Sequence, residues 1–343
     1  MDYRSLLQKA QDELGLPSVQ ASVLDGFIDH WLSALKASGR DPAGAQELIE
    51  RHIRLVAEQC VCPYRFAPFH QKLRAPHDFY SLALQWVDPM IDWERSTIEG
   101  EDRLDGLVQA VRRGENVIFL SNHQTEPDPQ ILCLMLGQKY PDLAEDIIFV
   151  AGHRVTHDPL SIPFSMGHDL ICIYSKRYIE HPPEEKAEKQ EHNRRTMRRL
   201  GELLAEGGKM IWVAPSGGRD RPDSEGNVQI APFDPQAVEM FGLMARQSRV
   251  PAHFCTLAMW TYDLLPPPAS VEVQIGEPRL PSYGPVHLCF GPDIPEDAIA
   301  FPEIADKKER RRMRAEALWQ MVCEDYARIV AHAGYPLTPH KKH

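Results

Sequence analysis

The sequence predicts an α/β protein in which a small N-terminal helical bundle precedes a larger α/β domain with a mixed, largely parallel sheet flanked by helices. Up to about residue 80, apolar residues recur at three- and four-residue spacing, as in amphipathic helices. From about residue 81, short apolar runs alternate with longer amphipathic segments, which is typical of a sheet with helical crossovers. We therefore expect two domains, residues 1–80 and 81–343, and the length of 343 residues also favours two.

The individual elements follow from these patterns. Segments 15–17 and 38–42 combine Gly and Pro and should separate the N-terminal helices. Apolar runs rich in Val, Ile and Phe predict strands at 117–120, 147–150, 170–174, 210–214, 254–260, 271–275 and 286–290. Amphipathic spacing predicts helices at 103–113, 129–136, 184–206, 235–247 and 307–331.

The composition excludes some classes of protein. A net charge of −11 argues against a general nucleic-acid binder. Seven scattered cysteines indicate reduced thiols rather than a disulfide framework. No apolar run approaches the ~18 to 20 residues that span a bilayer, and the start of the chain lacks signal- or transit-peptide character. We expect a protein of the cytoplasm, or of the plastid stroma if it is a mature plastid protein, with at most transient membrane contact.

Acid–base residues directly follow the apolar run 116–120. The segment S-N-H-Q-T-E-P-D places His123 and Asp128 in a loop before a helix that should begin near Pro129. The two residues would lie about 140° apart on a continuous helix, so only a loop brings them together. An imidazole held by a carboxylate keeps one tautomer and can take a proton from a hydroxyl. The spacing alone favours a simpler alternative, in which Asp128 caps the helix and His123 is an ordinary loop residue.

Cationic residues follow two later strands. Lys176 and Arg177 come after the run 170–174 and can bind phosphate, although a solvated strand end is an equal alternative. The strand at 210–214 leads into P-S-G-G-R-D-R-P, where glycines let backbone N–H groups approach a ligand. Arg219 and Arg221 supply guanidinium groups suited to bidentate phosphate contacts. For the Gly-Gly pair by itself, a plain turn is the alternative.

A metal site is a weaker hypothesis. His153 and His157 have the i, i+4 spacing of zinc ligands, and Asp158 follows. Pro159 breaks a helix at that point, and no third spaced ligand stands out. We expect neither a metal nor another cofactor.

The motifs together are similar to a known family. His-x4-Asp resembles the first block of the glycerolipid acyltransferases, and S-N-H-Q-T-E-P-D and P-S-G-G-R-D-R-P resemble the soluble, plastid-type glycerol-3-phosphate acyltransferases. A-P-F-D at 231–234, V-P-A-H-F-C-T-L-A at 250–258 and D-L-L-P-P-P at 263–268 continue the similarity. Relatives in the wider superfamily carry Glu-Gly-Thr-Arg where this chain has Ser-Gly-Gly-Arg at 216–219, so the resemblance is to the soluble subfamily.

The resemblance implies an enzyme that transfers an acyl chain from an acyl-carrier-protein or acyl-CoA thioester to the sn-1 hydroxyl of glycerol 3-phosphate. The product would be lysophosphatidic acid, in the first step of glycerolipid synthesis. His123 would be the general base, Asp128 would orient it, and no acyl-enzyme would form. The residues implied to bind the phosphate are Lys176, Arg177, Arg219 and Arg221, and the substrate loop is Ser216, Gly217 and Gly218. The subfamily typically has His where Tyr178 stands, so the resemblance assigns Tyr178 no role in binding phosphate.

Two other functions fit the motifs. A metal-dependent phosphohydrolase would use His123, Asp128, His153 and His157 as metal ligands. A non-enzymatic protein would only dock an acidic carrier.

The basic segment 186–199 predicts a docking face for acyl carrier protein, and the basic segment 307–314 is a second candidate for that role. A solvated helix face laced with Glu is the alternative. The cations of the first segment are Lys186, Lys189, Arg194, Arg195, Arg198 and Arg199.

Overall fold

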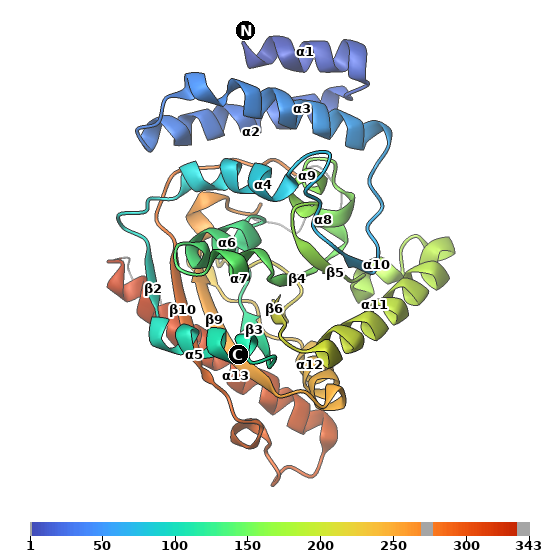
Figure 1. The fold of residues 1–343 in the computed structure, drawn as a ribbon, viewed down its shortest axis with the longest axis vertical. Helices are drawn as coiled ribbons and strands as arrows, with labels where there is room; N and C mark the ends of the chain where they lie inside the picture. The colour runs from blue at the N-terminus through green and yellow to red at the C-terminus, as the bar shows by residue number, and fades with distance from the viewer. Residues whose placement is uncertain (1, 269–276, 335–343) are drawn as a thin grey trace.

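The computed structural model describes residues 2–268 and 277–334, and within them an eight-stranded sheet forms the centre of the molecule (Figure 1). The strands lie in the order β1 (Phe69–His70), β5 (Asp169–Cys172), β4 (Ile148–Ala151), β6 (Met210–Val213), β3 (Asn116–Ser121), β9 (Ala252–Trp260), β10 (His287–Asp293) and β2 (Thr97–Glu99). Neighbours from β5 to β9 are parallel, whereas β1 is antiparallel to β5 and β10 is antiparallel to β9. The predicted mixed, largely parallel sheet is therefore confirmed.

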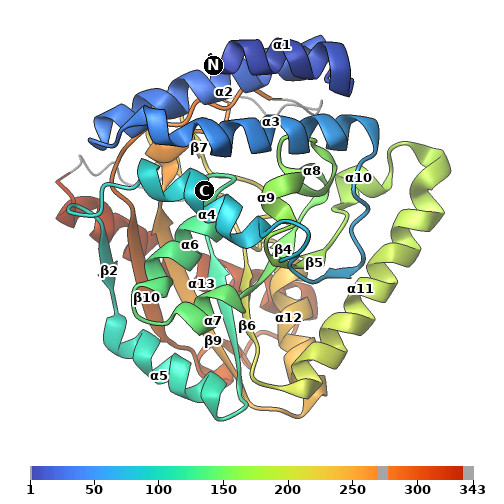
Figure 2. The ribbon, with the colours of Figure 1, turned by 45° about the horizontal axis from the view of Figure 1, so that its top comes forward.

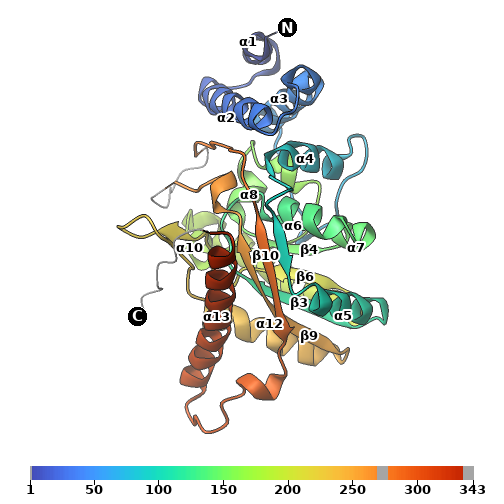
Figure 3. The same cartoon turned by 90° about the vertical axis from the view of Figure 1, so that its left-hand side faces the viewer.

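Strand β3 shows why the sheet is covered on both faces. Its residues are all buried, and they alternate between two hydrophobic clusters. Val117 and Phe119 pack on one face, and Ile118 and Leu120 pack on the other. Figure 3 shows the helices on these two faces. The first face carries α4 (Phe79–Val87), α5 (Glu101–Arg112), α6 (Asp128–Gly137) and α7 (Pro141–Glu145), and the second carries α11 (Lys186–Glu206), α12 (Pro235–Ser248) and α13 (Lys307–His332).

The N-terminal helices form a further layer over the first face. They are α1 (Tyr3–Leu14), α2 (Ser18–Ala37) and α3 (Gln46–Val61), and Figure 2 shows them crossing above α4 and the short helix α9 (Ile162–Ser165). The Trp31 indole N–H donates a 2.7 Å hydrogen bond to the Trp86 carbonyl, which ties α2 to α4. Residues of all three helices belong to the same hydrophobic cluster as the first face of the sheet. The predicted helical bundle is confirmed, and the domain boundary near residue 80 stays a prediction.

Some boundaries differ from the sequence-based expectation. The strand predicted at 170–174 ends at Cys172, because the side chain of Asn193 in α11 binds both the N–H and the carbonyl of Tyr174. The strand predicted at 271–275 lies outside the described residues. The remaining short elements, which the sequence did not indicate, are α8 (His153–His157), α10 (Lys176–Ile179), β7 (Arg221–Pro222) and β8 (Val228–Gln229). None of the helices in the described part of the chain combines the length and the apolar character needed to cross a membrane.

The end of the sheet opposite the polar loops carries a pH-sensitive contact. His253 at the start of β9 binds Asp293 through Nδ1 at 2.6 Å and Glu115 through Nε2 at 2.9 Å. Burial alone would lower the pKa of His253, but the two carboxylates outweigh it and raise the pKa. Protonated His253 is therefore stabilised in the folded protein. This contribution is present below the unfolded pKa of about 6.5 and is lost as pH rises through the folded value.

We expect His253→Gln to lower the melting temperature at mildly acid pH and to have little effect at alkaline pH. Thermal unfolding of the parent and the variant, measured across this pH range, tests the expectation. A difference between the two proteins that does not change with pH would contradict it.

Candidate active site

Polar loops from four strands meet at one edge of the sheet. His123 follows β3, His153 follows β4, Ser216 follows β6 and Thr261 follows β9. These strands are parallel, so their carboxyl ends lie side by side, and this is where open α/β sheets bind ligands. A cavity of about 490 Å³ opens at this edge. It is within the usual range for a small-molecule site, about 300–1,000 Å³.

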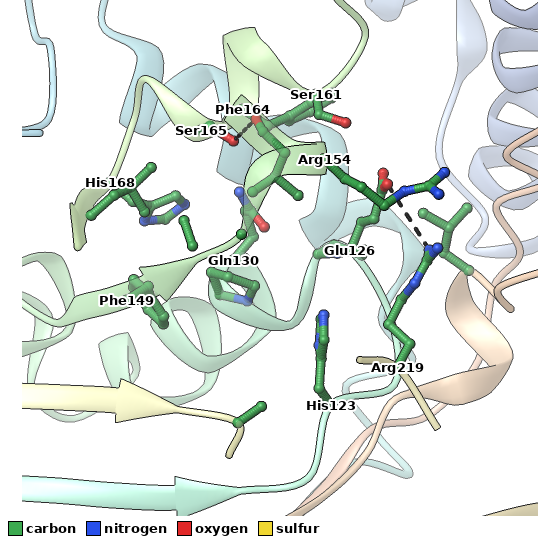
Figure 4. A pocket seen from close by; sticks show the side chains of 18 of the residues that line it. His123, Glu126, Gln130, Phe149, Arg154, Ser161, Phe164, Ser165, His168 and Arg219 are labelled. Carbon is green, nitrogen blue, oxygen red and sulfur yellow. Dashed lines mark hydrogen bonds and ion pairs between the residues drawn. The ribbon is translucent and has the colours of Figure 1, made fainter. Parts of the chain in front are cut away.

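The predicted pair His123 and Asp128 is brought together in this cavity. The distance from His123 Nδ1 to Asp128 Oδ2 is 2.8 Å. The carboxylate is fully buried, whereas the His123 side chain is 24% exposed and points into the cavity (Figure 4). Because the ionised carboxylate accepts the Nδ1 proton, Nε2 keeps a free lone pair. The pair therefore has the arrangement of a general base and its orienting partner.

A dense set of donors holds the Asp128 carboxylate. Its oxygens accept hydrogen bonds from the backbone N–H groups of Gln124 and Thr125 and from the hydroxyls of Thr125 and Thr261, at 2.5 to 3.2 Å. Burial would raise the pKa of Asp128, but the bonds from His123 and the two threonines outweigh it and lower the pKa. Asp128 is the first residue of α6, yet its carboxylate turns back to the preceding loop and makes no cap hydrogen bond to the helix. The simple N-cap interpretation is therefore wrong.

The neighbours of His123 fix its loop to distant elements. Asn122 exchanges hydrogen bonds with the backbone of Met259 in β9, through its amide group and its carbonyl. Gln124 accepts from the N–H of Thr261 and donates to the Tyr326 hydroxyl in α13. Asn122 and Gln124 are both fully buried. The sequence analysis missed these positioning residues, although an unbroken polar run between two apolar segments was a signal for them.

Asp220 connects the His123 loop to the arginine loop. Its N–H donates to the His123 carbonyl at 2.6 Å, and its carboxylate accepts from Asn122 Nδ2 and from the Ala231 N–H. Burial raises the pKa of Asp220 to about 7. The loop that carries Arg219 and Arg221 is therefore attached directly to the loop that carries His123.

Arginines occupy one side of the cavity. Arg219 and Arg221, both predicted, line it together with Arg154 and Arg279, which were not. Figure 4 shows Arg154 and Arg219 facing the same region beside His123. Glu277 pairs with both of these guanidinium groups, at 2.6 Å to Arg154 and 2.5 Å to Arg219.

A second buried carboxylate cluster holds Arg279. Its guanidinium binds both oxygens of Glu126, at 2.7 and 3.0 Å, and reaches Asp158 at 2.8 Å. Burial opposes ionisation of Glu126, but Arg279 and its neighbouring cations lower the pKa of Glu126 to about 2. Glu126 also lies 3.9 Å from Arg219, so it connects the two clusters. Single arginines at distant positions gave no sequence signal for this network.

The loop at 216–218 shapes the edge of the cavity. Ser216, Gly217 and Gly218 all line it, and the Ser216 hydroxyl donates to the Gly218 carbonyl at 3.0 Å. Gly217 has a φ of +67°, which L side chains rarely adopt. A Cβ at Gly218 would meet no atom within 4 Å, so the backbone there is open to a ligand.

The residues that follow β4 and β5 differ in how they relate to the cavity. Lys176 and Arg177 begin α10, and their side chains lie outside the described part of the structure. Tyr178 lines the cavity with its ring 4.6 Å from that of His153. The ring centroids of His153 and His157 lie 3.8 Å apart with the rings tilted by 35°, and burial together with His157 lowers the pKa of His153 to about 4. Among the described residues, no group of three or more His, Cys, Asp or Glu side chains is arranged to hold a metal ion.

Aromatic side chains form the other side of the cavity. Trp212 of β6 lies 5.7 Å from His123, measured between ring centroids, and Phe149 of β4 lies 6.0 Å from Trp212. The N-terminal layer also contributes, through Phe27 of α2, and Trp86 of α4 lies beside it in the lining. The cavity therefore has a cationic side and an apolar side, with His123 between them (Figure 4).

The basic segment 186–199 lies in α11, and its cations are in different environments. Arg195 and Arg198 are exposed. Arg194 pairs with Glu191 at 2.6 Å, and Arg199 pairs with Glu202 at 3.1 Å. Lys189 was predicted on the basic face, but it is buried and donates to the His181 carbonyl at 2.6 Å. Assigning Lys189 to that face was therefore wrong, because the side chain turns inward to meet a backbone acceptor.

Comparisons with known proteins agree with the site. The profile of the Acyltransferase family matches residues 104–260. A chloroplastic glycerol-3-phosphate acyltransferase of Cucurbita moschata is 36% identical over 327 residues, which are 94% of this chain and 72% of the relative. The chloroplastic glycerol-3-phosphate acyltransferase of Arabidopsis thaliana is 33% identical, over 95% of this chain and 71% of the relative's length. That of Spinacia oleracea is 34% identical, over 93% of this chain and 68% of the relative's length. The chain therefore belongs to the glycerol-3-phosphate acyltransferase family.

Proposed function

We propose that the cavity transfers an acyl chain from a thioester directly to the sn-1 hydroxyl of glycerol 3-phosphate, giving lysophosphatidic acid. The observation that carries this proposal is the His123–Asp128 pair, with its free Nε2 between a cationic and an apolar side of one cavity. Labelled acyl thioester, incubated with glycerol 3-phosphate and the protein, tests it. The expected product is the 1-acyl ester, and a 2-acyl ester or free fatty acid as the main product would contradict the proposal.

In the proposed reaction, His123 carries the proton from the acceptor hydroxyl to the leaving thiolate while the acyl group is transferred. His123 Nε2 takes the proton of the sn-1 hydroxyl as that oxygen attacks the thioester carbonyl carbon. The Asp128 carboxylate stabilises the imidazolium that forms and holds it in position. The tetrahedral intermediate then collapses, the C–S bond breaks, and the leaving thiolate takes the proton back from His123. No side chain forms a covalent intermediate in this sequence.

The cationic side of the cavity suits the phosphate of the acceptor. Arg219 and Arg221 are the proposed ligands carried over from the sequence motif, and Arg154 and Arg279 add positive charge beside them. Guanidinium groups bind phosphate through paired, charge-assisted hydrogen bonds. Glu277 and Glu126 hold Arg219, so its planar group is already oriented before the substrate arrives. Lys176 and Arg177 remain proposed ligands on the strength of the motif.

We expect Arg219→Ala to raise the KM for glycerol 3-phosphate far more than the KM for the acyl donor. Arg219→Lys should restore only part of the affinity, because a lysine lacks the bidentate fork. Steady-state kinetics with each substrate varied in turn measure both constants. A change confined to the KM of the donor would mean that the two substrates occupy each other's sides of the cavity.

The acyl donor has two candidate forms, acyl-carrier protein and acyl-CoA. We propose that exposed cations of α11, chiefly Arg195 and Arg198, attract the acidic surface of an acyl carrier protein. The pairing of Arg194 and Arg199 with glutamates on the same helix favours the competing view of a solvated face.

Charge reversal at Arg195 and Arg198 separates these two views. If α11 docks the carrier, the double variant should lose kcat/KM with acyl-carrier protein while it keeps kcat/KM with acyl-CoA, and added salt should reproduce the loss in the parent. The double reversal Lys9→Glu and Lys36→Glu is the control for net charge, since it changes the charge by the same amount at exposed side chains of the N-terminal layer. Equal effects on both donors would remove α11 from carrier recognition.

Two alternative functions have less support than acyl transfer. Membership in the acyltransferase family favours acyl transfer over a metal-dependent phosphohydrolase that uses His123, Asp128, His153 and His157 as ligands. It also favours acyl transfer over a docking protein without activity.

The chloroplastic names of the relatives support the plastid stroma as the compartment in which the enzyme acts, with the cytoplasm as the alternative.

A further inference from the structure

The cavity opens to solvent at one end and is closed at the other. Among the described residues that line it, those exposed to solvent lie in the loops after β4, β5 and β6, and they are Gly152, Ser175 and Gly217. The residues that the N-terminal layer and α4 contribute to the lining are buried, and they include Phe27, His52 and Trp86. A substrate therefore enters past these loops, and the N-terminal layer covers the closed end.

Four aromatic side chains of the lining pack against one another at the closed end. The ring of Phe164 in α9 lies 4.9 Å from that of His52 in α3, measured between centroids. The His52 ring lies 4.9 Å from Trp86 and 6.0 Å from Phe27. Figure 4 shows Phe164 and His123 on opposite sides of the cavity. The four side chains therefore form an aromatic wall on the side away from the general base.

The aromatic wall is apolar and held from behind. Burial lowers the pKa of His52 to about 3, so this ring is neutral and packs among the others without a charge. Trp31 of α2 supports Trp86 through a ring contact of 4.4 Å and through the hydrogen bond to its carbonyl. Close-packed interiors leave few voids into which a side chain can retreat. The terminal methyl group of an acyl chain that reaches the wall therefore finds an apolar surface but no further room.

We propose that the aromatic wall, through Phe27 and Phe164, sets the upper limit of the acyl-chain length that the enzyme accepts. This inference rests on the proposed function, since it assigns the closed end of the cavity to the acyl chain. The thioester carbonyl has to lie beside His123 to react, so the space between His123 and the wall determines how many methylene groups fit. A longer chain overpacks the wall or draws its carbonyl away from the base. The N-terminal layer, which carries none of the motif residues, is thereby a specificity element of the enzyme.

Two substitutions at one position change the size of the wall in opposite directions. Leucine is smaller than phenylalanine, and tryptophan is larger. We expect Phe27→Leu to raise kcat/KM about tenfold for the first saturated acyl-CoA beyond the parent's limit, relative to the last one within it, since one methylene in an apolar pocket is worth at least this factor. Phe27→Trp should move the limit towards shorter chains. The even-numbered saturated acyl-CoA series is assayed with glycerol 3-phosphate in parent and variants.

Further variants separate the wall from a general loosening of the core. Phe164→Leu enlarges the same wall from α9, so it carries the test by itself if the variants at position 27 do not fold. Phe241→Leu is the matched control, because Phe241 is 1% exposed in α12, on the opposite face of the sheet, and does not line the cavity. It should keep the chain-length profile of the parent.

Three results would overturn the inference and leave the proposed function standing. One is an unchanged profile in folded Phe27→Leu or Phe164→Leu, and another is an equal shift in Phe241→Leu. The third is a shift with Phe149→Leu alone, which would place the end of the chain against the sheet rather than the N-terminal layer. Failure of the parent to acylate glycerol 3-phosphate with any donor would overturn the proposed function and this inference with it.

Discussion

His123→Ala is expected to lower kcat by roughly 10²- to 10⁴-fold, the usual contribution of a positioned general base. The imidazole is the group whose free nitrogen faces the cavity while Asp128 holds the other nitrogen at 2.8 Å. Removing it takes away the acceptor for the hydroxyl proton, but it leaves the arginine side of the cavity in place. Glycerol 3-phosphate should therefore still bind, which calorimetry can measure alongside steady-state kinetics.

The fold of this variant should survive, because the loop is held by Asn122 and Gln124 rather than by the imidazole. His30→Ala, at an exposed position on α2, is the matched control and should keep full activity. If His123→Ala were within a few-fold of the parent, His123 would have no part in proton transfer.

Arg279→Met is expected to cost about 3–5 kcal/mol of unfolding free energy, because it removes one partner from a buried ionic cluster. The Arg279 side chain is 7% exposed and binds Glu126 and Asp158, whose side chains are 13% and 3% exposed. Methionine has a similar length but cannot compensate either carboxylate. Urea denaturation, followed by circular dichroism, measures the change.

Arg312→Met is the matched control for this stability prediction. Arg312 also pairs with two carboxylates, Glu309 and Glu316, but it does so on the exposed surface of α13. Solvent screens such pairs, so the same substitution there should change stability little. Equal effects at positions 279 and 312 would show that burial of the Arg279 cluster has no energetic consequence.

Local patterns in the sequence were sufficient to predict the central strands of the sheet, whereas the pair of His123 and Asp128 was predicted from the family motif. The apolar run at 117–120 became the buried centre of β3, because alternate residues pack on both faces. His123 and Asp128 are five residues apart, at the end of β3 and the start of α6, so the family motif and the geometry refer to the same short segment. The boundary at Tyr174 was wrong because Asn193, in a later helix, binds its backbone, and such a contact has no periodic signal.

The network around the arginines could not be predicted in the same way. Arg279 meets Glu126 and Asp158 across separations of 153 and 121 residues, so the contacts exist only in the folded chain.

Thiol release from an acyl donor, with and without glycerol 3-phosphate, tests the central claim most directly. If His123 activates the acceptor hydroxyl for direct attack, thiol should appear only when glycerol 3-phosphate is present. No initial burst should then occur without the acceptor, and a chelator should leave the rate unchanged. A stoichiometric burst of thiol without acceptor would reveal an acyl-enzyme and contradict direct transfer. Release of inorganic phosphate that a chelator abolishes would instead favour the metal-dependent phosphohydrolase.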